Sequence, residues 1–422
     1  MESIEEMKRN LKKLLEHKGE GARIRSRVKW FEEGEKSSKY FFNLEKRNAK
    51  EKAWENILDA DGNIVCGLQN ILETQVKFYS DLYTAEAIQP DDTFLKAIDS
   101  ELTDDQSQNL DRDITMLELT KSLKLMKNNK SPGPDGIVTE FYKYYWKDIG
   151  QDLFEVFQNS LNKELLPQSQ YLAVICLIFK KGERENLKNW RPISLLNTDY
   201  KILTKLLAER LIEVLPHIIH RDQKGCVKGR NIGENIILIR DLVEQCEDNE
   251  AVILVDQQKA FDRVELSWLF QVLDKFKFGK SFISCLKTLY KDMKSCILTN
   301  GYVSSVFPVT RGIRQGDSLS ALLYILQLEP LSAYFRKTQR INGIKLEGFN
   351  SAFEVRNKHY VDDTIICLNH INMTDECLDI IEEFGKVSGS KLNREKTIGL
   401  VMSDRVINSN TVLSHVRFTL GP

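Results

Sequence analysis

The sequence has no hydrophobic run long enough to cross a membrane. Its longest apolar segment, residues 171–179, has about half of the ~18 residues that indicate a membrane-spanning helix. The first residues, Met-Glu-Ser-Ile-Glu-Glu, lack the basic start and apolar centre of a secretory signal. We therefore expect an intracellular protein, in the nucleus or the cytoplasm or both, with no membrane partner.

Closely spaced cysteine pairs are also absent. The eight cysteines include no Cys-x-x-Cys spacing and lie mostly in apolar surroundings, which favours buried free thiols in a reducing compartment. Nothing in the composition indicates disorder, because hydrophobic residues make up 42% and charged residues 29% of the 422 residues. A chain of this length can form two or three domains with large cores.

A large net charge is missing as well, although charge is unevenly distributed along the chain. The net charge is −1; residues 53–119 carry 3 Lys and Arg against 15 Asp and Glu, whereas residues 120–240 carry 20 against 13. A basic segment beside an acidic one is compatible with nucleic-acid binding and equally with an ordinary solvated surface. Charge alone therefore neither supports nor excludes a nucleic-acid partner.

Two adjacent aspartates interrupt an apolar stretch. Tyr-Val-Asp-Asp at residues 360–363 is followed by Thr-Ile-Ile-Cys-Leu. Residues that favour strands on both sides predict a tight hairpin with Asp362 and Asp363 at its tip. Like charges at this spacing are unfavourable unless a cation binds them, and Mg²⁺ prefers such hard oxygen ligands. The alternative is a surface turn, in which aspartate is common.

A third aspartate follows a predicted buried strand. Residues 251–255 are Ala-Val-Ile-Leu-Val, and Asp256 comes directly after them. An aspartate in this place packs poorly but suits a metal ligand. Asp262 precedes an amphipathic helix through Trp268, so we expect Asp262 to be the N-cap of that helix.

A hairpin that carries basic residues is predicted in the middle of the chain. The apolar residues 172–179 lead to Lys180 and Lys181, and a second strand at residues 190–195 contains Arg191. Lys181 and Arg191 suit a finger-like hairpin that grips a triphosphate. The alternative is an ordinary charged hairpin tip.

Other basic residues lie in predicted loops and in an N-terminal arm that ends on Trp30. Such residues can track a nucleic-acid backbone while bases stack on a neighbouring aromatic ring. A solvated surface is the alternative for the arm. The candidate nucleic-acid contacts are Arg23, Arg25, Arg27, Lys130, Lys224, Lys228 and Arg230.

Turn signals divide the rest of the chain. An Asp-Gly-Asn turn at residues 61–63 lies within the acidic segment 53–119, for which we expect a small helical subdomain. Asn300-Gly301 predicts a hairpin whose second strand is residues 303–309. A helix that follows Asp199 is expected to stop before Pro216.

A glycine-containing loop at residues 311–318 precedes a long leucine-rich helix. Its glycines, Gly316 among them, would let the backbone approach a base pair closely, and Gln315 offers hydrogen bonds to a template or a nucleotide.

In this order, the segments resemble the reverse transcriptases of non-LTR (LINE-type) retrotransposons. Five motifs carry the resemblance besides the aspartate pair, and residues 23–42 look like the family's linker upstream of the polymerase. The motifs are Lys-Ser-Pro-Gly-Pro-Asp-Gly at 130–136, Trp-Arg-Pro-Ile-Ser-Leu at 190–195, Lys-Ala-Phe-Asp at 259–262, Arg-Gly-Ile-Arg-Gln-Gly at 311–316, and residues 388–396.

The resemblance implies an α+β right-hand polymerase fold with fingers and a palm, in which helices back an antiparallel palm sheet, plus a helical N-terminal extension. The implied extension or linker spans residues 1–119, the fingers with the start of the palm 120–245, and the palm 246–422. The reverse transcriptase domain would span about residues 160–422. The implied activity is RNA-directed DNA synthesis, with an RNA template, a DNA or RNA primer and dNTPs as partners.

The resemblance also implies roles for individual residues. Asp256, Asp362 and Asp363 would hold two Mg²⁺ ions, or Mn²⁺ in their place, with Asp363 only supporting the other two. Phe261 would lie under the nucleotide sugar and exclude a 2′-hydroxyl. Lys396 would protonate the pyrophosphate as general acid. The residues that would contact the nucleotide are Lys181, Arg191, Phe261, Gln315 and Gly316.

Several features depart from the family's pattern. Cys226 stands where an aromatic residue is usual, and Ser318 and Ala321 replace common prolines. The chain ends at Pro422, so we expect a truncated enzyme without the family's endonuclease, complete thumb or C-terminal Cys/His region. The alternative function is a retrotransposon remnant that binds RNA without productive synthesis.

Overall fold

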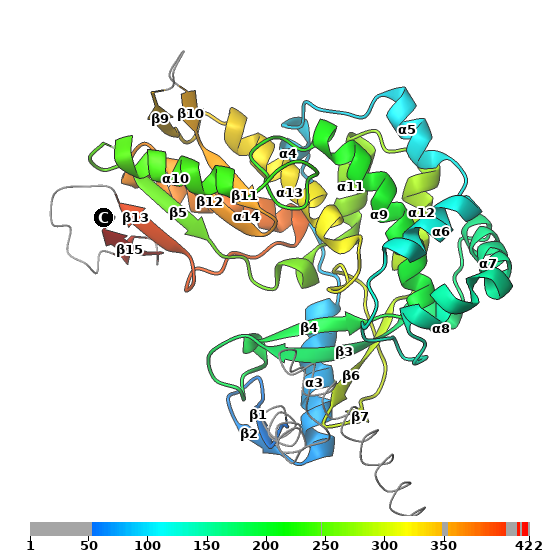
Figure 1. Ribbon diagram of the computed structural model, residues 1–422. Coiled ribbons are helices and arrows are strands. Elements are labelled where there is room, and N and C mark those ends of the chain that lie inside the picture. Colours follow the sequence, from blue (N-terminus) through cyan, green and yellow to red (C-terminus); the bar gives the residue numbers. More distant parts are fainter. Residues whose placement is uncertain (1–52, 246, 348–352, 402–411, 414–415, 421–422) are drawn as a thin grey trace, which may run out of the picture. The chain divides into compact units, whose positions relative to one another are not determined.

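The computed structural model describes residues 53–245, 247–347, 353–401, 412–413 and 416–420 (Figure 1). These residues form two compact units. The small unit comprises residues 53–75, 179–190 and 298–304, and the large unit comprises the remaining described residues.

The small unit contains an antiparallel hairpin of β1 (Asn56–Leu58) and β2 (Ile64–Cys66). The Asp59 carboxylate accepts hydrogen bonds from the backbone N–H of Asp61 and of Asn63, at 2.9 and 2.8 Å, and Gly62 has a positive φ of 85°. These contacts confirm the turn predicted at residues 61–63. The unit also holds the start of α3 (Leu68–Tyr83), the 3₁₀ helix η1 (Leu187–Asn189) and β7 (Tyr302–Val303).

A five-stranded sheet has the order β4-β3-β6-β7, and β8 also pairs with β6. Its other strands are β3 (Leu172–Phe179), β4 (Trp190–Leu195), β6 (Lys294–Thr299) and β8 (Phe307–Pro308). Asn300 and Gly301 both have positive φ, which confirms the predicted hairpin turn. The single second strand predicted at residues 303–309 is wrong. The partner of Leu298 is Val303 but that of Ser295 is Phe307, so one extra residue bulges out and divides the strand in two.

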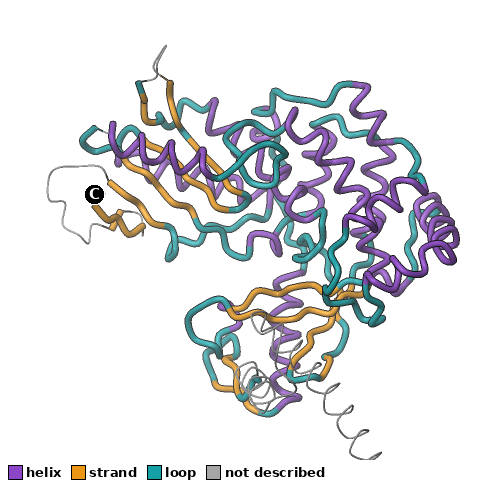
Figure 2. The backbone as a smooth tube through the Cα atoms, in the orientation of Figure 1, coloured by secondary structure: helices purple, strands orange, loops and turns teal. Residues whose placement is uncertain are grey.

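Helices are the main secondary structure of the large unit (Figure 2). Thr103 and Thr115 begin two of its helices with capping boxes to Gln106 and Glu118. The helices are α4 (Thr93–Lys96), α5 (Asp104–Asp111), α6 (Met116–Leu125), α7 (Thr139–Asn162), α8 (Gln168–Tyr171), α9 (Thr198–Ile218), α10 (Gly233–Gln245), α11 (Leu266–Lys275), α12 (Lys280–Tyr290), α13 (Ser320–Lys337) and α14 (Thr374–Ser388), with the 3₁₀ helices η2 (Ala260–Arg263) and η3 (Ile371–Met373).

The expected end of a helix before Pro216 is wrong, because α9 contains Pro216 in its last turn and continues to Ile218. Proline cannot donate a backbone hydrogen bond at position 216. The helical hydrogen bonds nevertheless continue beyond it, because the Ile219 N–H donates to the carbonyl oxygen of Leu215 at 2.9 Å.

The large unit also contains a six-stranded sheet, called the central sheet below, in the order β11-β12-β5-β13-β15-β14. All neighbours are antiparallel except the parallel pair β13–β15. A separate antiparallel pair consists of β9 (Ile344–Leu346) and β10 (Phe353–Val355). The strands of the central sheet are β5 (Ala251–Val255), β11 (Asn357–Tyr360), β12 (Asp363–Leu368), β13 (Ile398–Val401), β14 (Val412–Leu413) and β15 (Val416–Leu420).

The two faces of this sheet differ. Alternation puts Ile253, Val255 and Ile366 on one face, where they are buried on the side of α13 and α14 (Figure 1). On the other face, α10 and the β9–β10 pair cover Val252 and Cys367, whereas part of β5 and β13 stays open. Leu254 and Ile398 on that open part are 37% and 42% exposed. A ligand therefore has access to one face of the sheet only.

The cysteines do not all follow the expectation of buried thiols. Cys296, Cys367 and Cys377 are buried, whereas Cys66 and Cys226 are exposed, and none of the described cysteines forms a disulfide. Within the described ranges, no helix is long and apolar enough to span a bilayer.

Candidate active site

Three aspartates lie at one end of the central sheet. Asp256 follows the last residue of β5, and Asp363 is the first residue of β12. The two strands are antiparallel neighbours, and Thr364 is the partner of Val255. The next step along this register brings Asp363 opposite Asp256, both on the partly open face. The structure therefore joins two segments that the sequence separates widely.

Asp362 lies in the turn between β11 and β12. Tyr360 pairs with Asp363, so Val361 and Asp362 form a two-residue turn. This confirms the predicted hairpin, with Asp362 at its tip and Asp363 just inside the strand. Val361 has a φ of 60°, which is unusual for a β-branched residue.

A residue that sequence reasoning missed orients Asp256. Asn393 Nδ2 donates a hydrogen bond to Asp256 Oδ2 at 2.6 Å, and the Asn393 N–H donates to the Asp256 carbonyl oxygen at 2.9 Å. The Asp256 N–H donates to Thr397 Oγ1 at 3.3 Å. Asn393 binds Oδ2, so the other carboxylate oxygen of Asp256 can bind a cation. Asn393 lies inside the motif at residues 388–396, which was the only signal for it in the sequence.

The aspartate pair creates a negative potential around the turn. Burial, and then the charges of Asp362 and Asp363, raise the pKa of Tyr324 well above its usual value. Burial, followed by the Asp362 charge, raises the pKa of the Cys226 thiol. A negative potential on an open face favours the binding of a divalent cation.

The three aspartates do not form a ready-made metal cage. In the part of the chain that the structure describes, no three His, Cys, Asp or Glu side chains come together as a metal site. Mg²⁺ nevertheless binds through one or two carboxylates, with water and phosphate as its other ligands. The three aspartates therefore suit a divalent ion whose remaining ligands are water and the phosphates of a bound nucleotide.

Phe261 lies on η2 and packs against Tyr324, the tyrosine whose pKa burial and the charges of Asp362 and Asp363 raise. The half-buried ring of Phe261 stacks on Tyr324, with centroids 4.8 Å apart and an interplanar angle of 20°. Tyr324 in turn donates a hydrogen bond to Gln257 Oε1 at 2.8 Å. The packing fixes one side of the Phe261 ring.

The expected N-cap role of Asp262 is wrong. Asp262 is fully buried within η2, and its carboxylate accepts hydrogen bonds from the Tyr83 hydroxyl at 2.9 Å and from Gln315 Nε2 at 3.0 Å. Glu265 is the residue that precedes α11, and its side chain makes no capping bond. The Asp262 carboxylate binds Tyr83 and Gln315 instead of capping a helix, because a buried carboxylate needs hydrogen-bond partners.

The interaction of Asp262 changes the expectation for Gln315. Its amide nitrogen is held by Asp262, so Gln315 can offer a ligand mainly its carbonyl oxygen. Gly316 has a φ of 113°, and a Cβ there would lie 3.0 Å from the Ser194 carbonyl oxygen. In the structure, Gly316 therefore lets the backbone approach β4 closely, whereas the sequence suggested an approach to a base pair.

The buried carboxyl group of Asp262 should make the free energy of unfolding depend on pH. Burial raises the pKa of its carboxyl from the usual 3.8 to about 6. Between these values the folded protein holds a proton that the unfolded chain releases, so the free energy of unfolding should fall as the pH rises. Asp262→Asn removes this titration, and the stability difference between variant and wild type should change by about 2 kcal/mol between pH 4 and pH 7. Urea unfolding at four pH values measures it, and parallel pH profiles of the two proteins would contradict the assignment.

The other predicted nucleotide-binding residues are exposed. Lys181 lies in the small unit after β3, and Arg191 lies on β4 in the large unit. Lys396 follows Asn393 by three residues in the loop before β13, and its side chain is exposed. No hydrogen bond or ion pair joins Lys396 to any of the described aspartates. Their roles stay predictions.

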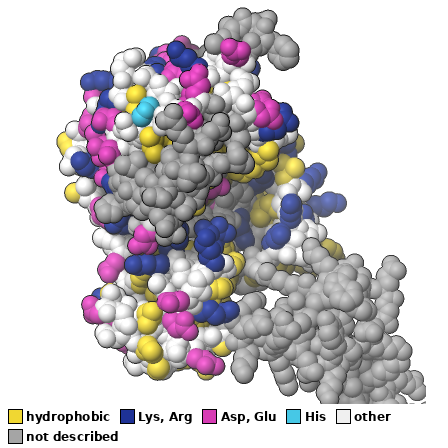
Figure 3. Space-filling view, turned by 90° about the vertical axis from the view of Figure 1, so that its left-hand side faces the viewer, with side chains coloured by type: hydrophobic (Ala, Val, Ile, Leu, Met, Phe, Trp, Pro, Cys, Tyr) yellow, Lys and Arg dark blue, Asp and Glu magenta, His cyan; other side chains and the backbone are white. Residues whose placement is uncertain are grey.

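The candidate nucleic-acid contacts are dispersed. Lys130 is exposed in the loop before α7, while Lys224 and Lys228 pair with Glu234 and Glu213. Arg230 donates hydrogen bonds to the carbonyl oxygens of Gln223 and Ile219, among others. On the face drawn in Figure 3, basic and acidic side chains are intermixed. Arg23, Arg25 and Arg27 lie outside the described residues, and all seven roles stay predictions.

Comparisons with known proteins agree on one family. A family model described as "Reverse transcriptase (RNA-dependent DNA polymerase)" matches residues 178–408. The "Transposon TX1 uncharacterized 149 kDa protein" of Xenopus laevis is 34% identical over 406 residues, which are 94% of this chain and 30% of that protein. The "Retrovirus-related Pol polyprotein from type-1 retrotransposable element R2" of Popillia japonica is 25% identical over 228 residues, which are 53% of this chain and 31% of that protein.

Among solved structures, the apo telomerase of Candida tropicalis, truncated from its C-terminal domain, has a TM-score of 0.41 and 15% identity, with 62% of this chain and 57% of that chain covered. A likeness of this extent adds nothing to the assignment. The chain spans just under a third of the length of the two curated relatives named above.

The family model covers more than half of the chain, including the ends of both aspartate-bearing strands. This match confirms the predicted α+β right-hand polymerase fold. The chain belongs to the reverse transcriptase (RNA-dependent DNA polymerase) family, and the two curated relatives named above come from a transposon and a retrotransposable element.

Proposed function

We propose that this chain catalyses RNA-directed DNA synthesis, with two Mg²⁺ ions held by Asp256 and Asp362 and supported by Asp363. The observation that carries the proposal is the meeting of Asp256 and the aspartate hairpin at one end of two paired strands, on the open face of the sheet. Mn²⁺, which also prefers oxygen ligands, would substitute. The family uses a divalent metal in general, and the choice of Mg²⁺ is part of the proposal.

The ions would lower the pKa of the primer 3′-hydroxyl and neutralise the charge of the leaving pyrophosphate. Asn393 holds the Asp256 carboxylate in one orientation, so the ligand does not have to reorganise when an ion binds. Lys181 and Arg191 would bind nucleotide phosphates, and Lys396 would donate a proton to the pyrophosphate. Gln315 and Gly316 would face the base pair.

The proposed partners are an RNA template, a DNA or RNA primer, and dNTPs. Residues 120–245 would form the fingers and the start of the palm, and residues 246–422 the palm. The basic residues named above would contribute the phosphate contacts, which should make binding strongly dependent on salt.

Primer extension tests the proposal. The purified chain is incubated with an RNA template, an annealed DNA primer and four dNTPs, in parallel reactions with Mg²⁺, Mn²⁺, Ca²⁺ or EDTA. Template-dependent extension with Mg²⁺ or Mn²⁺ and none with EDTA supports it. RNA binding without extension under all conditions would contradict it and favour a remnant that only binds RNA.

Phe261 supplies a prediction about nucleotide choice. Phe261→Val should admit ribonucleotides, because the smaller side chain opens the space that a 2′-hydroxyl would occupy. We expect the rNTP to dNTP ratio of kcat/KM to rise by about 10- to 200-fold, the range typical of a reshaped apolar pocket. Single-nucleotide incorporation with dNTP and rNTP measures the ratio.

Phe270→Val is the matched control, since Phe270 is a half-buried ring on α11. It should lose packing without any change in sugar preference. An unchanged ratio in Phe261→Val would show that Phe261 only packs against Tyr324.

A further inference from the structure

The turn that carries Asp362 needs support from outside the hairpin. Val361 has a φ of 60°, and a β-branched residue in this left-handed region is strained. Such a conformation persists only where the surrounding contacts hold it. The contacts come from residues 219–232, which connect α9 to α10 and are called the 219–232 loop below.

One buried side chain in this loop binds both backbone groups of Val361. Gln223 Nε2 donates a hydrogen bond to the Val361 carbonyl oxygen at 3.2 Å, and the Val361 N–H donates to Gln223 Oε1 at 2.8 Å. The same Oε1 accepts the Gly225 N–H at 2.8 Å. Gln223 is 2% exposed. Two-point binding fixes both the position and the rotation of the peptide groups beside Asp362.

The loop also lies against the hairpin as an additional strand segment. Gln223 forms a parallel bridge with His359 of β11. The His359 N–H donates to the Asp222 carbonyl oxygen at 2.9 Å, and the Lys224 N–H donates to the His359 carbonyl oxygen at 3.0 Å. A Cβ on Gly225 would lie 2.6 Å from the Val361 nitrogen, so only glycine permits this approach. The loop thereby covers the outer edge of β11.

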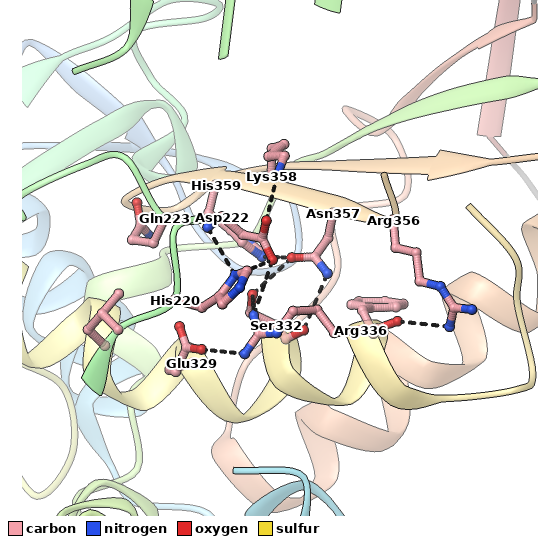
Figure 4. Close-up of polar contacts among 12 residues, drawn as sticks. His220, Asp222, Gln223, Glu329, Ser332, Arg336, Arg356, Asn357, Lys358 and His359 are labelled. Atoms are coloured by element: carbon pink, nitrogen blue, oxygen red, sulfur yellow. Dashed lines mark hydrogen bonds and ion pairs between the residues drawn. The ribbon is translucent and has the colours of Figure 1, made fainter. Parts of the chain in front are cut away.

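Buried charges hold the loop in register with the hairpin (Figure 4). The Asp222 carboxylate binds Lys358 of β11 and lies 3.2 Å from Arg336 Nη1. Arg336 Nη2 reaches Glu329 of α13 at 2.7 Å. The loop, the hairpin strand and α13 are therefore linked by charges that are mostly shielded from water.

We propose that Gln223 is a positioning residue that sets the orientation of the Asp362 and Asp363 carboxylates through the Val361 turn. The inference rests on the function proposed above, because it assigns Gln223 a part in the same site. A purely structural glutamine would stabilise the fold without any selective effect on the hairpin or on turnover.

Gln223→Met tests the inference, because methionine keeps the length and volume of the side chain but removes its two hydrogen bonds to Val361 and its hydrogen bond to Gly225. Gln170→Met is the matched control. Gln170 is also 2% exposed, and its amide binds Asp199, away from the hairpin. Three quantities are compared: the urea midpoint of unfolding, hydrogen–deuterium exchange of the peptide that spans residues 357–366, and kcat and KM for dNTP in primer extension.

Both variants should lose stability, whereas only Gln223→Met should show faster exchange in residues 357–366. Its kcat should fall about 10- to 100-fold, the usual effect of losing support behind a metal ligand, with little change in KM. If Gln223→Met fails to fold, Gln223→Asn carries the test, because asparagine is one methylene too short to reach both Val361 groups.

Equal exchange and equal kcat in the Gln223 and Gln170 variants would overturn the inference. The proposed function fails separately, when the wild-type chain does not extend a primer. In that case the exchange comparison still decides whether Gln223 holds the turn, since it requires no catalysis.

Discussion

Asp256→Asn and Asp362→Asn should each reduce primer extension by at least about 10³-fold, the scale of losing a main electrostatic group in an active site. A neutral amide cannot bridge two dications, so the loss should appear in kcat rather than in RNA binding. Asp363→Asn should lose less activity, because in the proposed site Asp363 would only support the other two. Single-turnover extension and RNA-binding titration, performed on the same preparations, separate the two effects.

Asp152→Asn, a change of an exposed aspartate on α7, serves as the control and should extend primers as the wild type does. Activity within a few-fold of wild type in either Asp256→Asn or Asp362→Asn would show that the metal ligands lie elsewhere.

The largest effect on stability is expected at Arg336. It pairs with Asp222 and Glu329, whose side chains are only 6% and 3% exposed, and it donates a hydrogen bond to Ser332 Oγ at 2.8 Å. Burial raises the pKa of Glu329, which shows how costly its charge is in this place. Arg336→Met leaves buried charge without its partner, which costs about 3–5 kcal/mol of the free energy of unfolding. Urea unfolding measures the change.

Arg340→Met is the comparison for that variant. Arg340 pairs with Glu376 and Glu383, but these side chains are 41% and 43% exposed, so water screens the charges. We expect a loss below about 1 kcal/mol. Equal losses in the Arg336 and Arg340 variants would mean that the buried network contributes no more than a surface one.

Much of the candidate site could be predicted, because short sequence patterns indicate each of the strands that carry it. The run at residues 251–255 indicated a buried strand, and the residues around the aspartate pair indicated a hairpin. Both elements are present, as β5 and as β11–β12. The family resemblance supplied the one fact that no local pattern contains, namely that these two segments meet.

The contacts that support the site could not be predicted in the same way. Asn393 and Asp256 are 137 positions apart, and Gln223 and Val361 are 138 apart. Asparagine and glutamine are common on surfaces, so neither residue stands out without the fold. Asp262 shows the same limit, because its local position suggested a helix cap while its real partners, Tyr83 and Gln315, come from distant segments.

The central proposal is that Asp256 and Asp362 hold two ions together. The most direct measurement is anomalous diffraction from crystals of the chain with a primer terminated at its 3′ end, an RNA template, a dNTP and Mn²⁺. We expect two peaks roughly 3.5–4 Å apart, with Asp256 and Asp362 contacting both. Peaks at other residues, or an occupied nucleotide site without metal at these aspartates, would contradict it.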